Sequence, residues 1–185
     1  QVLKEFSVPK NWEFEKAVGS NICFNDTSDN KKILYRGVSG KYYKYDGVEL
    51  TKNNEVIAAG PNYHDYILNS DGSVKFDAGA LGYKNISKIN DFDFYKALKD
   101  NGESGKFDIV DKNGKVIRQN VNNSLVMDKS GLAAYYENNT IYFFDFFGED
   151  IGNVGVSDIF YSEAENKEIK NIKFIKGLLW INAED

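Results

Sequence analysis

The chain has 185 residues, a mass of 21.0 kDa and a formal net charge of −5, and it is 42% hydrophobic and 15% aromatic. These values predict a globular domain with a substantial core and exclude a disordered chain. Its 23 basic residues include two arginines, Arg36 and Arg118, and an acidic, arginine-poor composition argues against nucleic-acid binding. No run approaches the roughly 18 apolar residues of a membrane-spanning helix.

Cys23 is the single cysteine, so the chain can form no internal disulfide and no cysteine-based metal site. The sequence starts at Gln1 rather than at a methionine, which favours an extracellular or cell-surface protein, with the cytoplasm as the alternative. Abundant Lys, Asn, Ile, Tyr and Phe with scarce Arg is typical of a low-GC genome and indicates a bacterial, phage or protist source.

The first elements in chain order are short apolar segments separated by polar turns. "VLKEFSV" (2–8) predicts a strand. Residues 22–47, "ICFNDTSDNKKILYRGVSGKYYKYDG", predict three strands joined by two polar turns. The stretch "YYKYDGVEL" (42–50) predicts a short hairpin that turns at Asp46-Gly47.

A longer hairpin pattern occurs three times, in "YILNSDGSVKF", "FDIVDKNGKVI" and "YFFDFFGEDI". In each, an apolar strand ends at Asn or Asp, glycine follows three residues later, and an apolar residue starts the return strand. Asn and Asp tolerate the turn, while glycine supplies a positive φ. The pattern predicts one repeated hairpin, at 66–76, 107–117 and 142–151.

Two segments have patterns that fit either a helix or a strand. "DFDFYKALKDNG" (91–102) alternates like a strand, but it also has Asp91 as a possible helix N-cap and Gly102 as a stop. "SEAENKEIKNIKFI" (162–175) is equally ambiguous, and "GLLWI" (177–181) after it predicts a final strand.

Residues 125–148, "LVMDKSGLAAYYENNTIYFFDFFG", repeat the order of strands and turns found in residues 22–47. This grammar resembles the blades of β-propellers, which implies an all-β fold of antiparallel meanders, with about five small blades or part of a propeller. A β-sandwich or a fragment of a longer propeller are the alternatives. The single domain 1–185 would have provisional blades at 20–52, 53–80, 81–120, 121–155 and 156–185, the last completed by residues 1–8.

The resemblance identifies no specific family. WD repeats carry Gly-His and Trp-Asp pairs, but here the single His64 does not follow glycine, and neither Trp12 nor Trp180 precedes aspartate. No binding residue can therefore be transferred from such families.

Nucleophile motifs are missing from the sequence, so we expect no catalytic residue. There is no G-x-S-x-G motif, and Cys23 has no local signature of a catalytic thiol. The alternative is a carbohydrate-active hydrolase, which would use two inner-strand carboxylates at a set separation. Candidates near predicted strands are Asp91, Asp93, Asp145, Glu149, Asp150 and Asp158.

The sequence contains no strong motif for a metal or cofactor site. "NDTSDN" (25–30), "NSDGS" (69–73) and "DKNGK" (111–115) contain oxygen ligands, but none has the ligand series and closing glutamate of an EF-hand loop. A strand-connecting turn explains each one, and we expect neither a metal nor a cofactor.

Paired tyrosines are the strongest functional signal. Neighbouring residues on a strand point to opposite faces, so only one tyrosine of a pair can enter the core. The other packs between sheets or contacts a protein or a sugar. We therefore predict a non-catalytic module that binds a protein or glycan partner, with a partner chain possible at an open strand edge. A structural subunit of a larger assembly is the remaining alternative. The predicted binding residues are Tyr43, Tyr63, His64, Tyr66 and Tyr136.

Overall fold

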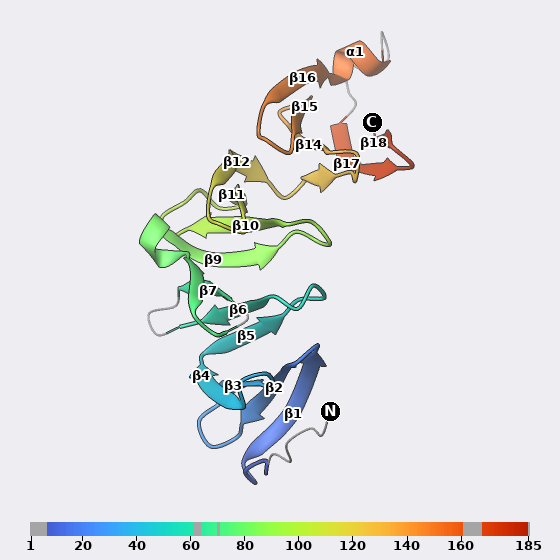
Figure 1. Ribbon diagram of the computed structural model, residues 1–185. Helices are drawn as coiled ribbons and strands as arrows, with labels where there is room; N and C mark the ends of the chain where they lie inside the picture. Colours follow the sequence, from blue (N-terminus) through green and yellow to red (C-terminus); the bar gives the residue numbers. More distant parts are fainter. Residues whose placement is uncertain (1–6, 61–63, 70, 161–167, 185) are drawn as a thin grey trace. The chain divides into compact units, whose positions relative to one another are not determined.

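The computed structural model describes residues 7–60, 64–69, 71–160 and 168–184, and almost all its regular structure is β-strand (Figure 1). Apart from a 3₁₀ turn at Gly79–Leu81 and the short helix α1 at Val156–Phe160, the described elements are strands. They are β1 (Trp12–Val18), β2 (Asn21–Asp26), β3 (Lys31–Arg36), β4 (Lys41–Tyr45), β5 (Gly47–Leu50), β6 (Val56–Ala59), β7 (Asp65–Leu68), β8 (Val74–Asp77), β9 (Tyr83–Lys88), β10 (Phe94–Lys99), β11 (Lys106–Asp111), β12 (Val116–Asn122), β13 (Val126–Met127), β14 (Leu132–Glu137), β15 (Thr140–Asp145), β16 (Asp150–Gly155), β17 (Glu168–Ile175) and β18 (Leu178–Glu184).

The strands form four sheets of four strands and one of two. Within each sheet the spatial order follows the chain order: β1-β2-β3-β4, β5-β6-β7-β8, β9-β10-β11-β12, β13-β14-β15-β16 and β17-β18. Consecutive four-stranded meanders are the blade unit of β-propellers. The predicted all-β class and the propeller-like repeat are therefore confirmed.

The repeated hairpin is confirmed in its backbone geometry. In each copy the glycine N–H donates to the carbonyl of the Asn or Asp three residues earlier, at 3.0 Å, and the glycine φ lies between 83° and 92°. These are hairpin turns closed by a left-handed residue, which glycine adopts without strain. The three glycines are Gly72, Gly114 and Gly148.

The predicted hairpin at Asp46-Gly47 is wrong. The structure places β4 in the first sheet and β5 in the second, so this dipeptide connects two sheets. Gly47 pairs with Ala59 of β6 instead, and the Asp46 N–H donates to the Ala59 carbonyl at 2.9 Å. The Asp-Gly pair marks a bend in the chain, but it does not determine which sheet the next strand joins.

Both ambiguous segments contain strands. Phe94–Lys99 forms β10, which pairs antiparallel with β9, and Glu168–Ile175 forms β17. Part of the second segment, and residues 1–6 of the segment 1–8 that was predicted to complete the last blade, lie outside the described residues, while residues 7 and 8 form no strand. The provisional blade boundaries stay a prediction; the described strands of the five sheets span 12–45, 47–77, 83–122, 126–155 and 168–184.

The chain divides into two compact units, and each is described by itself. The first comprises Gln1–Asp100 and Val110–Lys115, and the second comprises Asn101–Ile109 and Val116–Asp185. Two apolar clusters form much of the core of the first unit, because its strands present alternating apolar side chains to each other. The clusters are Cys23, Leu34, Leu50, Val56, Ala58 and Leu68, and then Ile57, Ile67, Phe76, Ala78, Tyr83, Ile86, Tyr95, Ala97 and Val110.

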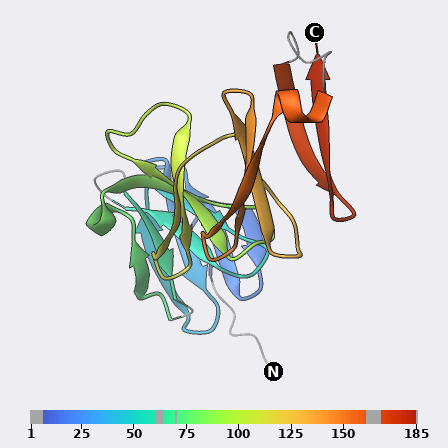
Figure 2. The same cartoon turned by 90° about the horizontal axis from the view of Figure 1, so that it is seen from above.

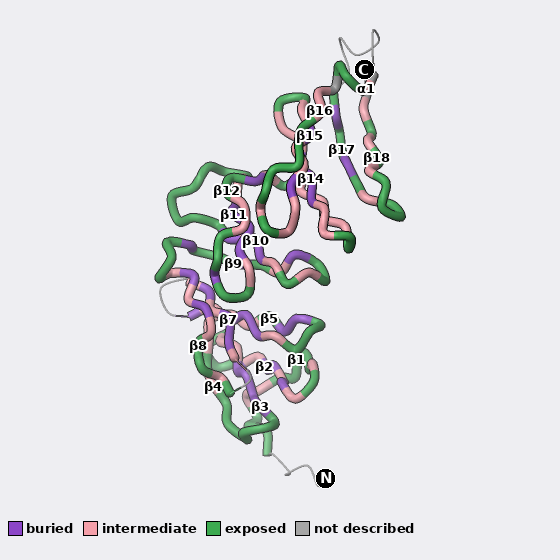
Figure 3. The backbone as a smooth tube through the Cα atoms, turned by 45° about the horizontal axis from the view of Figure 1, so that its top comes forward, coloured by how far each residue is buried: buried purple, intermediate pink, exposed green. Residues whose placement is uncertain are grey.

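The second unit has its own core, around the fourth sheet and the β17–β18 hairpin. Figure 2 shows this hairpin in red, with α1 in orange next to it. The buried residues of the hairpin lie on β17, whereas β18 is half-buried or exposed, as Figure 3 shows by colour. This core contains Ala134, Ile141, Ile169 and Ile172, with Val126, Tyr136, Phe143, Ile159, Phe174, Leu179 and Ile181 packed against them.

Candidate binding sites in the second unit

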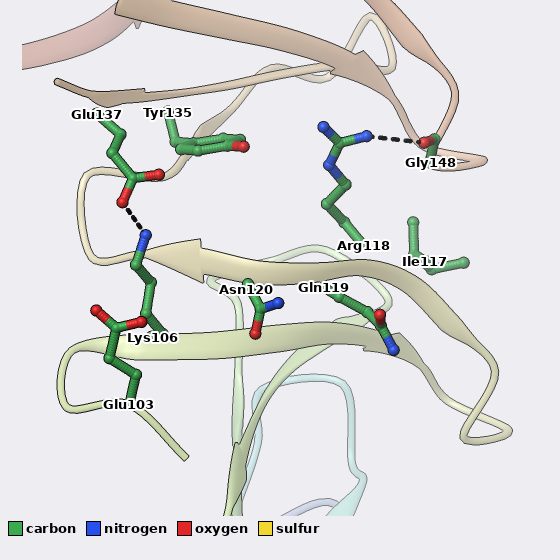
Figure 4. A pocket seen from close by; sticks show the side chains of 9 residues that line it. All are labelled: Glu103, Lys106, Ile117, Arg118, Gln119, Asn120, Tyr135, Glu137 and Gly148. Atoms are coloured by element: carbon green, nitrogen blue, oxygen red, sulfur yellow. Dashed lines mark hydrogen bonds and ion pairs between the residues drawn. The ribbon is translucent and has the colours of Figure 1, made fainter. Parts of the chain in front are cut away.

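A polar groove of about 530 Å³ lies between β12 and β14 of the second unit (Figure 4). One side comes from β12 and from the segment that leads into β11, and the other comes from β14 and the β15–β16 turn. Its lining combines carboxylates, cations, amides and one aromatic ring. The residues are Glu103, Lys106, Ile117, Arg118, Gln119, Asn120, Tyr135, Glu137 and Gly148.

The charges in the groove are largely paired. The Lys106 ammonium forms an ion pair with Glu137 across the groove, as Figure 4 shows. Arg118 pairs with Asp150 at 2.7 Å, and it also donates to the Gly148 carbonyl at 3.4 Å. Because each cation already has a carboxylate, the groove has little spare charge with which to attract an ionic ligand.

Aromatic packing holds one wall of the groove in place. The Tyr135 ring is 7% exposed and stacks on Tyr142, with ring centroids 5.2 Å apart and planes 19° apart. The Tyr135 and Phe144 rings meet edge to face, with their centroids 6.2 Å apart, and the Arg118 guanidinium lies 5.3 Å from the centroid of the Phe144 ring. Stacked and edge-to-face rings with a cation over one of them form a rigid wall.

The second candidate is the β17–β18 hairpin, whose sheet has two strands within the described residues. Every other sheet has four strands added in chain order, so the next strand of this sheet would pair with the free edge of β18. Within the described residues, β18 pairs with β17 alone. No described strand occupies the other edge of β18, and an unoccupied strand edge is a template for another strand.

Exposed apolar side chains lie on the outer face of this hairpin. Trp180 pairs with Lys173, and Leu178 pairs with Ile175, so these four side chains share the face opposite to the core. Leu178 is 67% exposed and Trp180 is 55% exposed. Large apolar side chains beside an unpaired strand edge are unusual on a folded surface and indicate an interaction site.

The inner face of the hairpin is fixed to the fourth sheet. Ile169 and Ile172 are buried against β14 and β15, and the Tyr136 hydroxyl donates to the Lys170 carbonyl at 2.9 Å. The hairpin is thus held from one side, and its outer face and β18 edge are left for other contacts.

The structure places the predicted binding residues in both units. Tyr43 on β4 and Tyr66 on β7 are half-buried in the first unit, where Tyr66 packs against the core. His64 is half-buried in the same unit, and its imidazole lies directly against Gly79. Tyr63 lies outside the described residues. The role of this set in binding stays a prediction.

Tyr136 belongs to the second unit, where its contacts are structural. Its N–H donates to the Ser124 hydroxyl at 2.9 Å, and its carbonyl accepts from the Asn122 side chain at 2.8 Å. Sequence reasoning missed the groove and Leu178 as candidate binding features. The sequence does place an apolar strand at 177–181, but it does not show which of its side chains a neighbour covers.

Several of the predicted carboxylates stabilise turns or ion pairs. Asp145 accepts the N–H groups of Phe147 and Glu149, both at 2.9 Å, inside its own hairpin turn. Asp150 pairs with Arg118, as described above. The carboxylates that line the groove are Glu103 and Glu137, and Glu137 is engaged with Lys106.

The three oxygen-rich turns use their aspartates in the same structural way. Asp26 accepts from the Ser28 hydroxyl at 2.5 Å, Asp71 accepts from the Ser73 hydroxyl at 2.6 Å, and Asp111 accepts two backbone N–H groups of its turn. Within residues 7–60, 64–69, 71–160 and 168–184, no three His, Cys, Asp or Glu side chains cluster as metal ligands would. No helix in those residues is long and apolar enough to span a membrane.

Comparison with known proteins gives structural neighbours only. No family model matches the chain, and no curated protein matches it. Hsv2 from Kluyveromyces lactis is 11% identical, with a TM-score of 0.41 over 85% of this chain and 51% of that chain. "KlHsv2 with loop 6CD replaced by a Gly-Ser linker" is 10% identical, with a TM-score of 0.44 over 89% of this chain and 57% of that chain.

Hydrazine synthase from Kuenenia stuttgartiensis is 8% identical, with a TM-score of 0.38 over 93% of this chain and 55% of that chain. The chain thus spans about half the length of these proteins. The propeller-like assignment rests on the sheets described above, and no function is inferred from these neighbours.

Proposed function

We propose that the protein is a non-catalytic interaction module of propeller type, and that it binds a partner protein at the free edge of β18. One observation carries this proposal: in the part of the chain that the structure describes, four sheets have four strands each, and the fifth has two. A segment that supplies the next strand would pair with the unpaired backbone groups of β18 and cover its outer face.

The chemistry of the hairpin points to an extended peptide segment as the ligand. Strand addition gains affinity from backbone hydrogen bonds and specificity from alternate side chains. Trp180 is the type of residue that dominates protein interfaces, and Leu178 and Ile175 extend the apolar surface around it. The matching partner segment alternates apolar and polar residues.

The chain itself supplies a probe. In the fourth sheet β13 and β14 are followed by the hairpin β15–β16, so residues 140–155 are the equivalent of the strands that would follow β17–β18. A fluorescein-labelled peptide with this sequence is titrated with the protein, and fluorescence anisotropy reports binding. A scrambled peptide of the same composition is the control.

A second readout comes from tryptophan fluorescence, because the chain has only two tryptophans. In the Trp12→Phe variant the signal comes from Trp180 alone, and the peptide of residues 140–155 contains no tryptophan. The proposal predicts that the anisotropy of the labelled native peptide rises to saturation and that the Trp180 emission shifts to shorter wavelength, with neither change for the scrambled peptide. Equal signals with the scrambled peptide, or no Trp180 shift, would contradict it. Light scattering of the protein alone shows whether a second copy already occupies the edge.

The groove favours a second candidate function, the binding of a neutral saccharide. The exposed amides of Gln119 and Asn120 offer hydrogen-bond donors and acceptors, and the charged side chains of the groove are paired. The groove thus combines polar groups with an aromatic wall and carries little net charge. Titration calorimetry with neutral oligosaccharides tests this, with Gln119→Ala as the variant. Binding that is weakened by the substitution supports a sugar site, whereas no heat with any sugar contradicts it. Hydrolysis is less favoured because Glu137 is already paired with Lys106.

A further inference from the structure

Arg36 ends β3 in the first unit and is almost completely buried, with 3% of its surface exposed. It lies on the same side of β3 as Leu34, toward the second sheet. One guanidinium nitrogen, Nη2, donates to the Asn69 carbonyl at 2.7 Å. The other two nitrogens, Nε and Nη1, are buried and have no hydrogen-bond acceptor among the described residues. The arginine is thus fixed at one end and has two unused donor groups.

An unpaired guanidinium in the interior of a protein requires a compensating group. Arginine remains protonated at every physiological pH, and removing a charge from water is unfavourable unless an opposite charge or acceptors replace the water. No carboxylate of the described residues forms an ion pair with Arg36. The nearby Asp71 is exposed, and its Oδ1 accepts the Ser73 N–H at 2.8 Å and the Ser73 hydroxyl at 2.6 Å.

The residues around Arg36 are half-buried. Asn69 accepts from Gly72 as well as from Arg36, so the guanidinium is attached to the β7–β8 turn. The Tyr43 hydroxyl lies 3.3 Å from the position that a Cβ on Gly72 would take. Burial raises the pKa of Tyr45, and the nearby Arg36 charge opposes that rise. Tyr43, Tyr45, Asn69 and Gly72 are all half-buried, so Arg36 lies close beneath the surface.

We propose that Arg36 is the centre of an oxyanion site in the first unit, which takes a carboxylate or phosphate group next to the Asn69 carbonyl. The charge of Arg36 acts on the exposed Asp71, but the two form no ion pair within the described residues. A bound oxyanion would supply a negative charge in direct contact with the guanidinium and acceptors for Nε and Nη1. Charge-assisted bonds from arginine to these groups are among the strongest polar contacts in proteins. The site is independent of the β18 edge, and it can be present whether or not that edge binds a partner.

The low arginine content makes a direct test possible. Protein labelled with ¹⁵N-arginine gives two Nε–Hε signals in an NMR spectrum, one from Arg36 and one from Arg118. The Arg118→Lys variant, which keeps the charge at that position, assigns them. Sodium phosphate and sodium acetate are titrated separately into a mildly acidic, chloride-only buffer at constant ionic strength, because salt alone screens charges.

The proposal predicts a saturable shift of the Arg36 signal with at least one of the two anions, while the Arg118 signal moves little. A response to phosphate alone identifies a phosphate site, and a response to acetate alone identifies a carboxylate site. If both anions leave the Arg36 signal unchanged, or shift both arginine signals linearly and equally, the proposal is wrong.

Thermal unfolding gives a second test that does not need the NMR assignment. The Arg36→Met variant replaces the guanidinium by an apolar side chain of similar length. The effective anion should raise the melting temperature of the wild type relative to sodium chloride and leave that of Arg36→Met unchanged. Equal increases for the two proteins would overturn the proposal, since the anion would then act elsewhere on the chain.

Discussion

Replacing Trp180 by alanine should weaken peptide binding at the β18 edge and leave the fold intact. A tryptophan side chain can bury up to about 250 Å², so the 55% of Trp180 that is exposed corresponds to roughly 140 Å². At about 25 cal/mol per Å², complete coverage is worth about 3.5 kcal/mol, and half coverage about 1.7 kcal/mol. The dissociation constant of the 140–155 peptide should therefore rise by about 20- to 300-fold.

Fluorescence anisotropy of the labelled peptide measures this change, and urea unfolding checks stability in parallel. Phe147→Ala is the matched control, because Phe147 is an aromatic side chain of the same unit, is 79% exposed and lies in the β15–β16 turn. It should leave the affinity unchanged. An affinity for Trp180→Ala within about twofold of the wild type, with peptide binding otherwise intact, would refute the reasoning from exposed area.

Three further predictions concern stability and reactivity. The folded-state pKa of Asp26 is lowered chiefly by the hydrogen bond from Lys44, so its stabilisation is present at neutral pH and is lost as the pH falls through that pKa; urea midpoints of wild type and Asp26→Asn should therefore converge on acidification, and a constant difference would contradict this. Gly148→Ala should lower the free energy of unfolding, measured in urea, by more than Gly131→Ala does. Both positions have a positive φ, which costs alanine about 1–2 kcal/mol, but only a Cβ at Gly148 collides with a backbone carbonyl of β12. Equal losses of stability in the two variants would exclude the collision. Burial, and secondarily Glu15, raises the pKa of the Cys23 thiol to about 12, so a thiol reagent should modify it only after unfolding, and rapid labelling of the native protein would contradict its burial.

The repeated hairpin was predictable because local chemistry determines it. An Asn or Asp followed three residues later by glycine closes the same turn at Gly72, Gly114 and Gly148, and each turn needs only neighbouring residues. Asp46-Gly47 has the same residue types, yet it connects two sheets. Whether a chain turns back on its own strand or starts a new sheet depends on pairing partners such as Ala59, which are distant in sequence.

The candidate sites were harder to predict, because burial depends on tertiary neighbours. The role of the paired tyrosines in binding stays a prediction, and some of them have internal contacts, as the Tyr136 hydroxyl does with the Lys170 carbonyl. A partner chain at an open strand edge was one expectation from the sequence, and it stays a prediction. Arg36 was not foreseen as a site, because its bonded partner Asn69 lies 33 residues away and its unused donors are apparent only in three dimensions.

Amide hydrogen exchange of β18 tests the central claim most directly. In the free protein, the N–H groups of β18 that point away from β17 have no partner among the described residues and should exchange rapidly. With saturating 140–155 peptide, alternate amides between Leu178 and Ala183 should become protected, while exchange in the first unit stays unchanged. If the peptide binds and β18 amides still exchange at their free rate, the partner does not add a strand at this edge.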